Sequence, residues 1–424
     1  MNNYLERILA AVAPGESGAA PFDSLTLSSR YQPIFCAAEQ RPFGYEGLLV
    51  AYTAEGKPVA PHRVFDRAES SGQAVYLDWL SRALHLRNWR QLGESRGRLF
   101  LNVTPTAAIE DAHFARVFPA MLKAYDVDPR DVIVEILEMN VEEEPQLVEA
   151  VKMYKTLGCK VALDDFGAGA SEMKRFWRLR PDIVKIDREM TRRVSVEPLA
   201  RRMFGGIVSV LHEAGALVCV EGIETETEAL CAAEANADLL QGHYFASPAA
   251  DLPPADICRD TFVNLHAGFR AESLETQARR EARLDPYLRA LTEAGRALGR
   301  GDGHGAAAVP LLALPCTQRC YLIASDGTQV GANLESEHNA SARDARLEPM
   351  LPSPGTNWQN KPYFRRALAV PDVVQMTRPY LSVTGPKHCL TLSLSCEVDG
   401  KLYVICADLD FAALEGESSG LPLS

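Results

Sequence analysis

Acidic and amide side chains follow a series of short apolar segments in the N-terminal half of the chain. Segments such as VIVEILE, KVALDDFGAG, DIVKID and LVCVEGIE each place one or two polar groups after an apolar run. The polar residues placed in this way are Glu46, Asn102, Glu135, Asp164, Asp165, Lys185, Glu221 and Gln241. Carboxylates that gather without cations repel one another and take up protons, and hard divalent ions such as Mg²⁺ and Mn²⁺ prefer oxygen ligands. The sequence therefore predicts a metal site.

The size of this ligand set predicts two ions rather than one. Two metals held about 3.5 to 4 Å apart can activate a shared water and stabilise the leaving oxygen of a phosphoryl displacement. We expect Asp164 to bridge the ions, Asp165 to engage the second ion, and Lys185 to donate to the attacking water or the phosphate. Taken singly, Asp165 or Glu221 also fits a helix cap and Asn102 a turn. Their shared position after strands favours the metal site.

Helical stretches separate the apolar segments. Apolar residues recur with helical spacing over 75–92, 114–125, 144–157 and 199–214. Strands that alternate with helices form a mostly parallel sheet, and this many repeats predict a closed α/β barrel of the TIM type. Such a barrel delivers polar groups from its strand ends to one mouth. An open doubly wound sheet is the alternative fold.

The sequence divides into three parts: a barrel over 1–255, a helical connector over 256–304 and a small α+β domain over 305–424. In the connector, Asp285 and Pro286 predict a helix start, because Asp caps helices and Pro suits the first turn. In the last part, Asp-Gly pairs at 326–327 and 399–400 predict two hairpins with type I′ turns. The segment NKPYFRRALA between them predicts a helix.

Composition narrows the function classes. The formal net charge of −12 disfavours binding to duplex nucleic acid, which requires clustered Lys and Arg. The longest apolar stretches fall short of the roughly 20 residues that a membrane helix needs, and we expect a cytoplasmic protein. The 10 cysteines include Cys159 and Cys219 in strand-like segments, which predicts buried, reduced thiols. The segment CTQRC, at 316–320, gives little support for a metal or redox site.

Residues 25–248 resemble the EAL-domain phosphodiesterases of bacterial cyclic di-GMP signalling. The motifs that carry the resemblance occur in the family's order: YQPIF, EGL, LNVTP, VEILE, DDFGAG, VKID, EGIE and QGHYFASP. The resemblance implies a modified β/α barrel whose first strand runs antiparallel to the others. It also implies hydrolysis of cyclic di-GMP to linear pGpG with two Mg²⁺ or Mn²⁺ ions, and inhibition by Ca²⁺.

The resemblance also assigns roles to single residues. It implies that one ion is held by Glu46, Asn102, Glu135 and Asp164, and the second ion or its water by Asp164, Asp165 and Glu221. Lys185 would hold the nucleophilic water, with Glu221 as the alternative general base, and Gln241 would support the network. Gln32 corresponds to a guanine-contacting residue. Glu138 corresponds to a glutamate that anchors the loop after Asp165, which implies a homodimer coupled to metal binding.

Departures from the family pattern bear on turnover. Val50 stands where the family has an Arg that contacts the substrate phosphate, and loss of such a contact costs roughly 1.5 to 3 kcal/mol. The segment ASEMKRFWRL replaces the family's residues after DDFGAG, and Leu137 replaces a Thr beside a metal ligand. Lys174, Arg175 and Arg178 are candidates to replace the missing charge, or are solvated loop residues.

Two functions are compatible with these departures. The first is a cyclic di-GMP phosphodiesterase, slowed by Val50. The second is a receptor that binds cyclic di-GMP with little hydrolysis and signals through a partner. The retained metal ligands and Lys185 favour the enzyme, because a receptor has no need of groups that activate water. No GGDEF-type synthase signature occurs, so synthesis of the nucleotide is not expected.

The span 305–414 is similar, far more loosely, to PAS-like or Cache-type sensory domains. The resemblance implies a small-ligand site, with Trp358, Tyr363, Arg378 and Tyr380 as candidates. The alternative is that these aromatic residues form a core and the domain serves only dimerisation. Because this domain follows a helical connector, we hypothesise that it changes how two barrels pack and so regulates the loop after Asp165.

Overall fold

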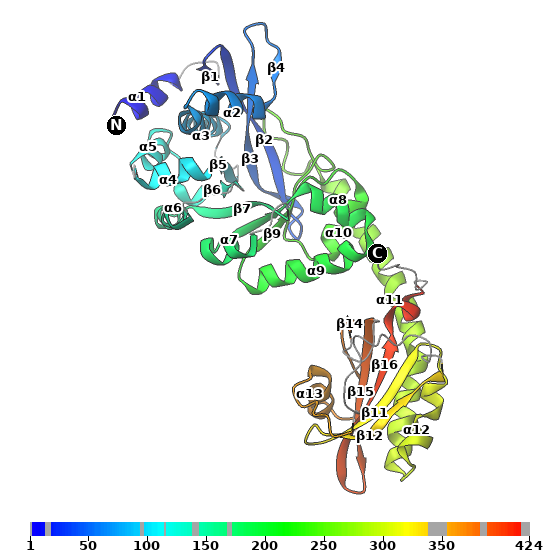
Figure 1. Cartoon of the computed structure of the whole chain (residues 1–424). Coiled ribbons are helices and arrows are strands. Elements are labelled where there is room, and N and C mark those ends of the chain that lie inside the picture. The colour runs from blue at the N-terminus through cyan, green and yellow to red at the C-terminus, as the bar shows by residue number, and fades with distance from the viewer. Residues whose placement is uncertain are drawn as a thin grey trace. The chain divides into compact units, whose positions relative to one another are not determined.

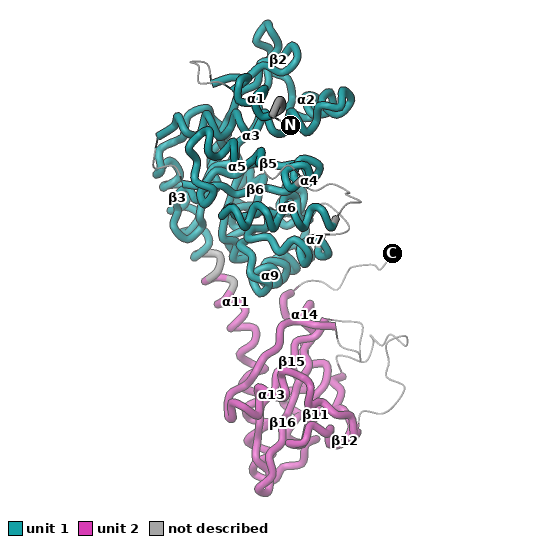
Figure 2. Tube along the Cα trace, turned by 90° about the vertical axis from the view of Figure 1, so that its left-hand side faces the viewer, with its two compact units in different colours: residues 1–271 teal, residues 272–424 magenta. Residues whose placement is uncertain are grey.

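The chain forms two compact units, residues 1–271 and 272–424 (Figure 2). The computed structural model describes residues 2–12, 18–93, 97–113, 116–137, 144–167, 172–337, 354–381 and 388–416. Glu138 and most of the loop after Asp165 lie outside the described residues.

The first unit is built on a closed barrel (Figure 1). Its sheet contains β1 (Ala19–Phe22), β2 (Leu25–Cys36), β3 (Arg41–Tyr52), β4 (Pro58–Val59), β5 (Arg98–Val103), β6 (Val132–Ile136), β7 (Lys160–Phe166), β8 (Ile183–Ile186), β9 (Leu217–Val220) and β10 (Leu239–Leu240). From β3 through β5 to β10 the paired neighbours are parallel. β2 closes the barrel by pairing antiparallel with both β3 and β10. The predicted barrel with an antiparallel first strand is confirmed, and the open sheet is wrong.

Helices surround this barrel. They are α1 (Asn2–Ala11), α2 (Pro61–Ser70), α3 (Ala74–Gln91), α4 (Pro105–His113), α5 (Val117–Ala124), the short 3₁₀ helix η1 (Pro129–Asp131), α6 (Glu144–Leu157), α7 (Glu172–Leu179), α8 (Arg188–Val196), α9 (Pro198–Glu213) and α10 (Glu226–Glu234). Local signals explain several starts. Asp187 caps α8 by accepting from the amide of Glu189, and Thr225 and Glu228 form a capping box on α10.

A layer of apolar side chains fills the barrel interior below the polar residues. Its buried members are Ile34, Phe100, Ile133, Ala162, Ile183, Cys219 and Leu239. In β5 to β10 each member lies two positions before a predicted site residue, and side chains two apart in a strand share a face. In β3 this level is occupied by Gly44, where a Cβ would lie 2.6 Å from the carbonyl oxygen of Arg98. The apolar layer therefore supports a polar layer at the mouth.

A long helix, α11 (Arg259–Gly299), contains Pro286, so the predicted helix start at Asp285 is wrong. Pro286 lacks an amide hydrogen, and Pro inside a helix costs about 3 kcal/mol. On either side of it, Leu284 and Tyr287 are buried in the core of the second unit, and this packing outweighs the local preference. Asp285 pairs instead with Arg289 one turn later, at 2.9 Å. The predicted break after this helix is confirmed, since α12 begins at His304.

The second unit is an antiparallel sheet with helices on both faces. Its elements are α12 (His304–Leu312), β11 (Thr317–Ala324), β12 (Gln329–Glu335), α13 (Pro362–Ala369), β13 (Gln375–Met376), β14 (Tyr380–Leu381), β15 (His388–Val398), β16 (Lys401–Asp410) and α14 (Phe411–Glu415). The strand order is β12-β11-β16-β15-β13, with β14 also paired to β15. One core joins α11 and α12 to the sheet, and another joins α13 to its opposite face. The predicted α13 helix is confirmed.

Both hairpins in this unit form, but only one has the predicted turn. Asp399 and Gly400 have φ angles of 50° and 73°, as a type I′ turn requires. At the other hairpin Gly327 has φ of 87°, whereas Asp326 is not among the residues with positive φ. The Asp326 carboxylate accepts from the amide of Thr328 at 2.9 Å, and this side-chain contact stabilises a different turn.

Among the residues that the structure describes, no helix combines the length and apolar character needed to cross a bilayer.

Candidate active site

Lys185 lies at the centre of the barrel mouth, where four strands deliver carboxylates to it. Its Nζ lies 2.6 Å from Glu135 Oε1, 3.2 Å from Asp164 Oδ1 and 3.5 Å from Glu46 Oε2. It also forms an ion pair with Glu221. The ammonium group therefore holds the negative charges together.

Amide side chains continue this network towards β2. Asn102 Nδ2 and Gln241 Nε2 donate to the two oxygens of Glu46 at 2.6 and 2.7 Å. Gln241 also donates to Gln32 Oε1 at 3.2 Å, and Gln32 donates to the carbonyl of Ala246. The structure thus brings these predicted residues into one hydrogen-bonded group.

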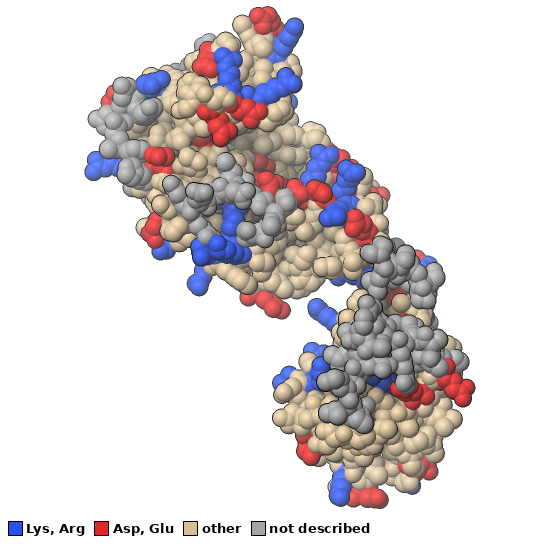
Figure 3. Space-filling view, viewed as in Figure 1, with Lys and Arg blue, Asp and Glu red and all other residues tan. Residues whose placement is uncertain are grey.

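The group is largely removed from solvent. Glu135 is 0% exposed and Lys185 1% exposed. In the space-filling view, acidic side chains lie in a hollow of the first unit (Figure 3). Burial raises the pKa of Glu135 and of Glu221 well above the ordinary glutamate value, against the opposing attraction of Lys185. Burial by itself lowers the pKa of Lys185. The combined attraction of the surrounding carboxylates is the larger effect, and it holds the pKa of Lys185 well above its usual range.

Two sets of carboxylates are spaced to share a cation. Oxygens of Glu46, Glu135 and Glu221 lie within 4.8 Å of one another, and so do oxygens of Asp164, Asp165 and Glu221. Glu221 belongs to both sets. Within the described part of the chain, the buried atoms Glu135 Oε2 and Gln241 Oε1 have no hydrogen-bond partner. Buried oxygens without donors, next to several carboxylates, fit hard divalent cations.

Comparison with known proteins identifies the family to which this barrel and its carboxylates belong. A model of the EAL domain family matches residues 21–248. The chain belongs to the EAL domain family.

The relatives of this EAL protein include RocR of Pseudomonas aeruginosa, a cyclic di-GMP phosphodiesterase that is 28% identical over 173 residues. These residues are 41% of this chain and 44% of RocR. An uncharacterized protein of Azorhizobium caulinodans is 27% identical over 52% of this chain and 31% of its own length. The chain therefore spans less than half the length of these two relatives.

YkuI of Bacillus subtilis, an uncharacterized EAL-domain containing protein, matches over more of the chain. It is 24% identical over 357 residues, which are 81% of this chain and 85% of YkuI. The crystal structure of YkuI in complex with substrate c-di-GMP and calcium has a TM-score of 0.77 and 21% identity, and covers 93% of this chain and 97% of YkuI. At this identity the likeness shows a shared fold.

Two of the departures within this EAL domain line one cavity. Val50, in β3, lines a cavity beside the carboxylates, and Leu137 lines the same cavity. Arg175 donates to the carbonyl of Leu137 at 3.0 Å. Among the described residues that line the cavity, neither Arg175 nor its basic neighbours Lys174 and Arg178 occur. Arg175 therefore contacts one residue of the cavity wall without lining the cavity itself.

Sequence reasoning missed a buried ion-pair network that fixes the turn after Asn102. Asp78 in α3 accepts from the amide of Thr104 at 2.9 Å and from its hydroxyl at 3.1 Å. Arg82, one turn later, lies 2.7 Å from Asp78 and 2.6 Å from Asp111. The available signal was the i, i+4 spacing of Asp78 and Arg82 in a helix rich in Leu and Trp.

In the second unit, the candidate ligand residues lie in different environments. Tyr363 is buried and accepts a hydrogen bond from Tyr321 at 3.2 Å. Tyr380 contacts the hydroxyl of Thr391 at 2.7 Å, and Thr391 donates to Asp408 at 2.6 Å.

Among the described residues, the other two candidates share no hydrogen bond with this group, although the ring of Trp358 lies 6.0 Å from that of Tyr321. Trp358 is half-buried and donates to Gln329 at 2.9 Å, and Arg378 is exposed.

Proposed function

We propose that this EAL protein hydrolyses cyclic di-GMP to linear pGpG with two divalent cations, Mg²⁺ or Mn²⁺. The observation that carries the proposal is Lys185, buried among carboxylates from four strands. A protein that only binds the nucleotide has no need to bury an ammonium group there, because desolvating a charge is costly.

The proposed roles combine the family resemblance with the spacing of the carboxylates at the mouth. One cation would be held by Glu46, Asn102, Glu135 and Asp164, and the other by Asp164, Asp165 and Glu221, whose oxygens lie within 4.8 Å of one another. When bound, the cations supply Lewis acidity to the phosphodiester. Lys185 donates a hydrogen bond that orients the attacking water. Glu221 either binds the second cation or accepts a proton from that water, and Gln241 keeps Glu46 in place. Gln32 contacts a guanine.

The direct test is product formation by the purified full chain with cyclic di-GMP and Mg²⁺ or Mn²⁺, followed chromatographically. We expect pGpG from the natural chain, no product from Glu46→Ala or Lys185→Met, and unchanged product from Glu213→Ala, an exposed acid at the end of α9. Ca²⁺ is expected to support binding and to inhibit hydrolysis. Binding without pGpG over hours supports the receptor function instead, and absence of both rejects both functions.

Two regulatory features are part of the proposal. The chain forms a homodimer in which Glu138 and the loop after Asp165 couple assembly to metal binding. The second unit acts as a PAS-like or Cache-like sensory domain for a small ligand, contacted by Trp358, Tyr363, Arg378 or Tyr380. Deletion of residues 301–424 tests the coupling. Unchanged hydrolysis and dimerisation after this deletion would rule it out.

A further inference from the structure

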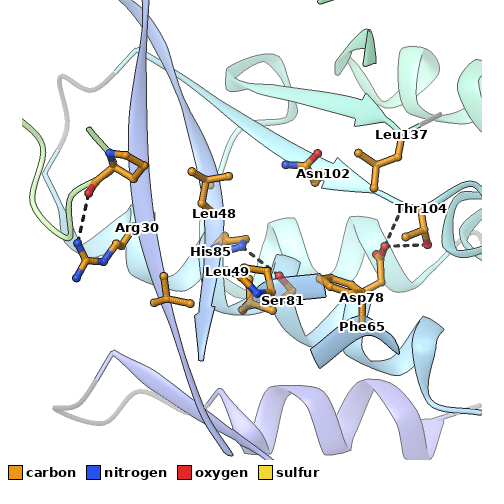
Figure 4. A pocket seen from close by; sticks show the side chains of 14 residues that line it. Arg30, Leu48, Leu49, Phe65, Asp78, Ser81, His85, Asn102, Thr104 and Leu137 are labelled. Atoms are coloured by element: carbon orange, nitrogen blue, oxygen red, sulfur yellow. Dashed lines mark hydrogen bonds between the residues drawn. The ribbon is translucent and has the colours of Figure 1, made fainter. Parts of the chain in front are cut away.

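A cavity of about 510 Å³ opens beside the carboxylates at the barrel mouth (Figure 4). Asn102, which donates to Glu46, lines the cavity and so connects it to the active site. Much of the remaining lining is apolar and includes Leu48, Val50 and Phe65. A volume of this size is typical of a pocket that binds a small molecule.

The cavity has one strong positive charge. Among its described lining residues, Arg30 is the only Lys or Arg. His85 also lines it, but burial lowers the pKa of His85 to about 4, so its ring is neutral at pH 7. The acid in the lining, Asp78, is already engaged by Arg82 and Thr104. An anion in this cavity would therefore find Arg30 as its cationic partner.

The register of β2 and β3 places Arg30 next to the metal ligands. Gln32 is paired with Glu46, and two positions away Arg30 is paired with Leu48. Side chains two apart share a face of a strand and are roughly 7 Å apart, so Arg30 faces the mouth as Gln32 does. Tyr31 between them is buried on the other face, against Trp89.

Arg30 keeps hydrogen-bonding capacity for a ligand. Its side chain is exposed, and its Nη1 donates to the carbonyl of Pro248 at 3.4 Å, the long end of the hydrogen-bond range. A guanidinium group carries five N–H donors in a planar fork that matches the oxygens of a phosphate. The contact with Pro248 uses one of them and orients the group (Figure 4).

We propose that Arg30 binds the phosphodiester of cyclic di-GMP that is not cleaved, and that the cavity holds the adjoining nucleotide. This inference rests on the proposed function. Cyclic di-GMP has two phosphodiesters, and cations held by the carboxylates neutralise only the one that they contact. Ser28, the strand partner of Val50, lies two positions from Arg30, so Arg30 restores from β2 the positive charge that β3 lacks at Val50.

The test is a series of variants that remove the positive charge from β2 or move it to β3. Binding of cyclic di-GMP is measured by calorimetry in the presence of Ca²⁺, which is expected to prevent hydrolysis. Arg30→Ala should weaken binding by about 10- to 100-fold, the effect of losing a charge-assisted contact, and Arg30→Lys should weaken it less. Adding Val50→Arg to Arg30→Ala should restore most of the affinity. Arg41→Ala, at an exposed β3 position whose partner is Glu39, is the matched control and should bind as the natural chain does.

Salt dependence provides a second readout. The affinity of Arg30→Ala should fall less steeply with added salt than that of the natural chain, because one charge contact has been removed. Binding by Arg30→Ala within twofold of the natural chain would overturn the role of Arg30 and leave the proposed function intact. Absence of binding by the natural chain itself would overturn both.

Discussion

Asp164 and Asp165 are consecutive residues of β7, yet both carboxylates lie within 4.8 Å of Glu221. Consecutive side chains of a regular strand point to opposite faces. The side chain of Asp165 departs from this alternation, because its φ is 55° and the pairing of β7 with β8 shifts between Leu163 and Phe166. This bulge turns two neighbouring carboxylates towards one site, and Asp is among the few residues that tolerate such a φ angle.

The first prediction separates the charge of Asp165 from its backbone conformation. Asp165→Asn and Asp165→Ala both remove the charge, so both should weaken Mn²⁺ binding by tenfold or more. Asn tolerates the left-handed conformation and Ala does not, so the Ala variant should unfold more easily than the Asn variant by about 1 kcal/mol without metal. Urea titration and calorimetry measure the two effects. Equal stability of the two variants would show that the backbone at this position is not strained.

The second prediction concerns pH. Burial raises the pKa of Glu135 and Glu221, so the folded metal-free protein holds protons more tightly than the unfolded chain. Its stability should therefore fall as pH rises above the ordinary glutamate pKa of about 4.5. A cation must displace these protons, so Mg²⁺ affinity should rise with pH above about 4.5, by up to about tenfold per pH unit for each proton released.

Calorimetry in two buffers of different ionisation enthalpy counts the protons released on Mg²⁺ binding. Glu221→Gln removes one of the titrating groups and should bind Mg²⁺ with a shallower pH dependence. An Mg²⁺ affinity that does not rise as pH increases from about 4.5 to 8 would contradict the raised pKa values.

The third prediction concerns the turn that carries Gln241. A Cβ on Gly242 would lie 2.0 Å from the carbonyl oxygen of Ile223 and 2.4 Å from its nitrogen, and neither backbone atom can move freely. Gly242→Ala should therefore lower the free energy of unfolding by about 3 kcal/mol or more and displace Gln241 from Glu46. Gly206→Ala, in α9 with open space around it, should instead be neutral or stabilising by about 1 kcal/mol. Urea unfolding of both variants provides the comparison.

The fourth prediction concerns the buried ion pair of the second unit. Arg319 Nε lies 2.8 Å from Asp408, which is 0% exposed. Arg319→Met leaves this carboxylate without its charge partner and should destabilise the second unit by about 3 to 5 kcal/mol. Arg289→Met breaks an exposed pair and should cost less than about 1 kcal/mol. Hydrogen exchange in β15 and β16 reports on this unit alone, and equal protection in both variants would refute the prediction.

The barrel and its polar mouth could be predicted because their signals are local. An apolar strand followed by a polar residue is a short-range pattern, and its repetition through Glu135, Lys185 and Glu221 implies one mouth once the strands are parallel. The Asp399-Gly400 turn follows from a local signal of the same kind, but the identical pair Asp326-Gly327 forms a different turn, so the pair alone does not determine the turn type.

Other features depend on contacts between distant parts of the chain. Pro286 remains inside a helix because residues beside it pack in a distant core, and local preference cannot reveal that packing. Arg30 becomes important only through its register with β3 and the cavity it lines. The sequence alone determined which groups meet at the mouth. Their distances, burial and protonation were determined by the closure of the barrel, because β2 meets β10 only in the folded chain.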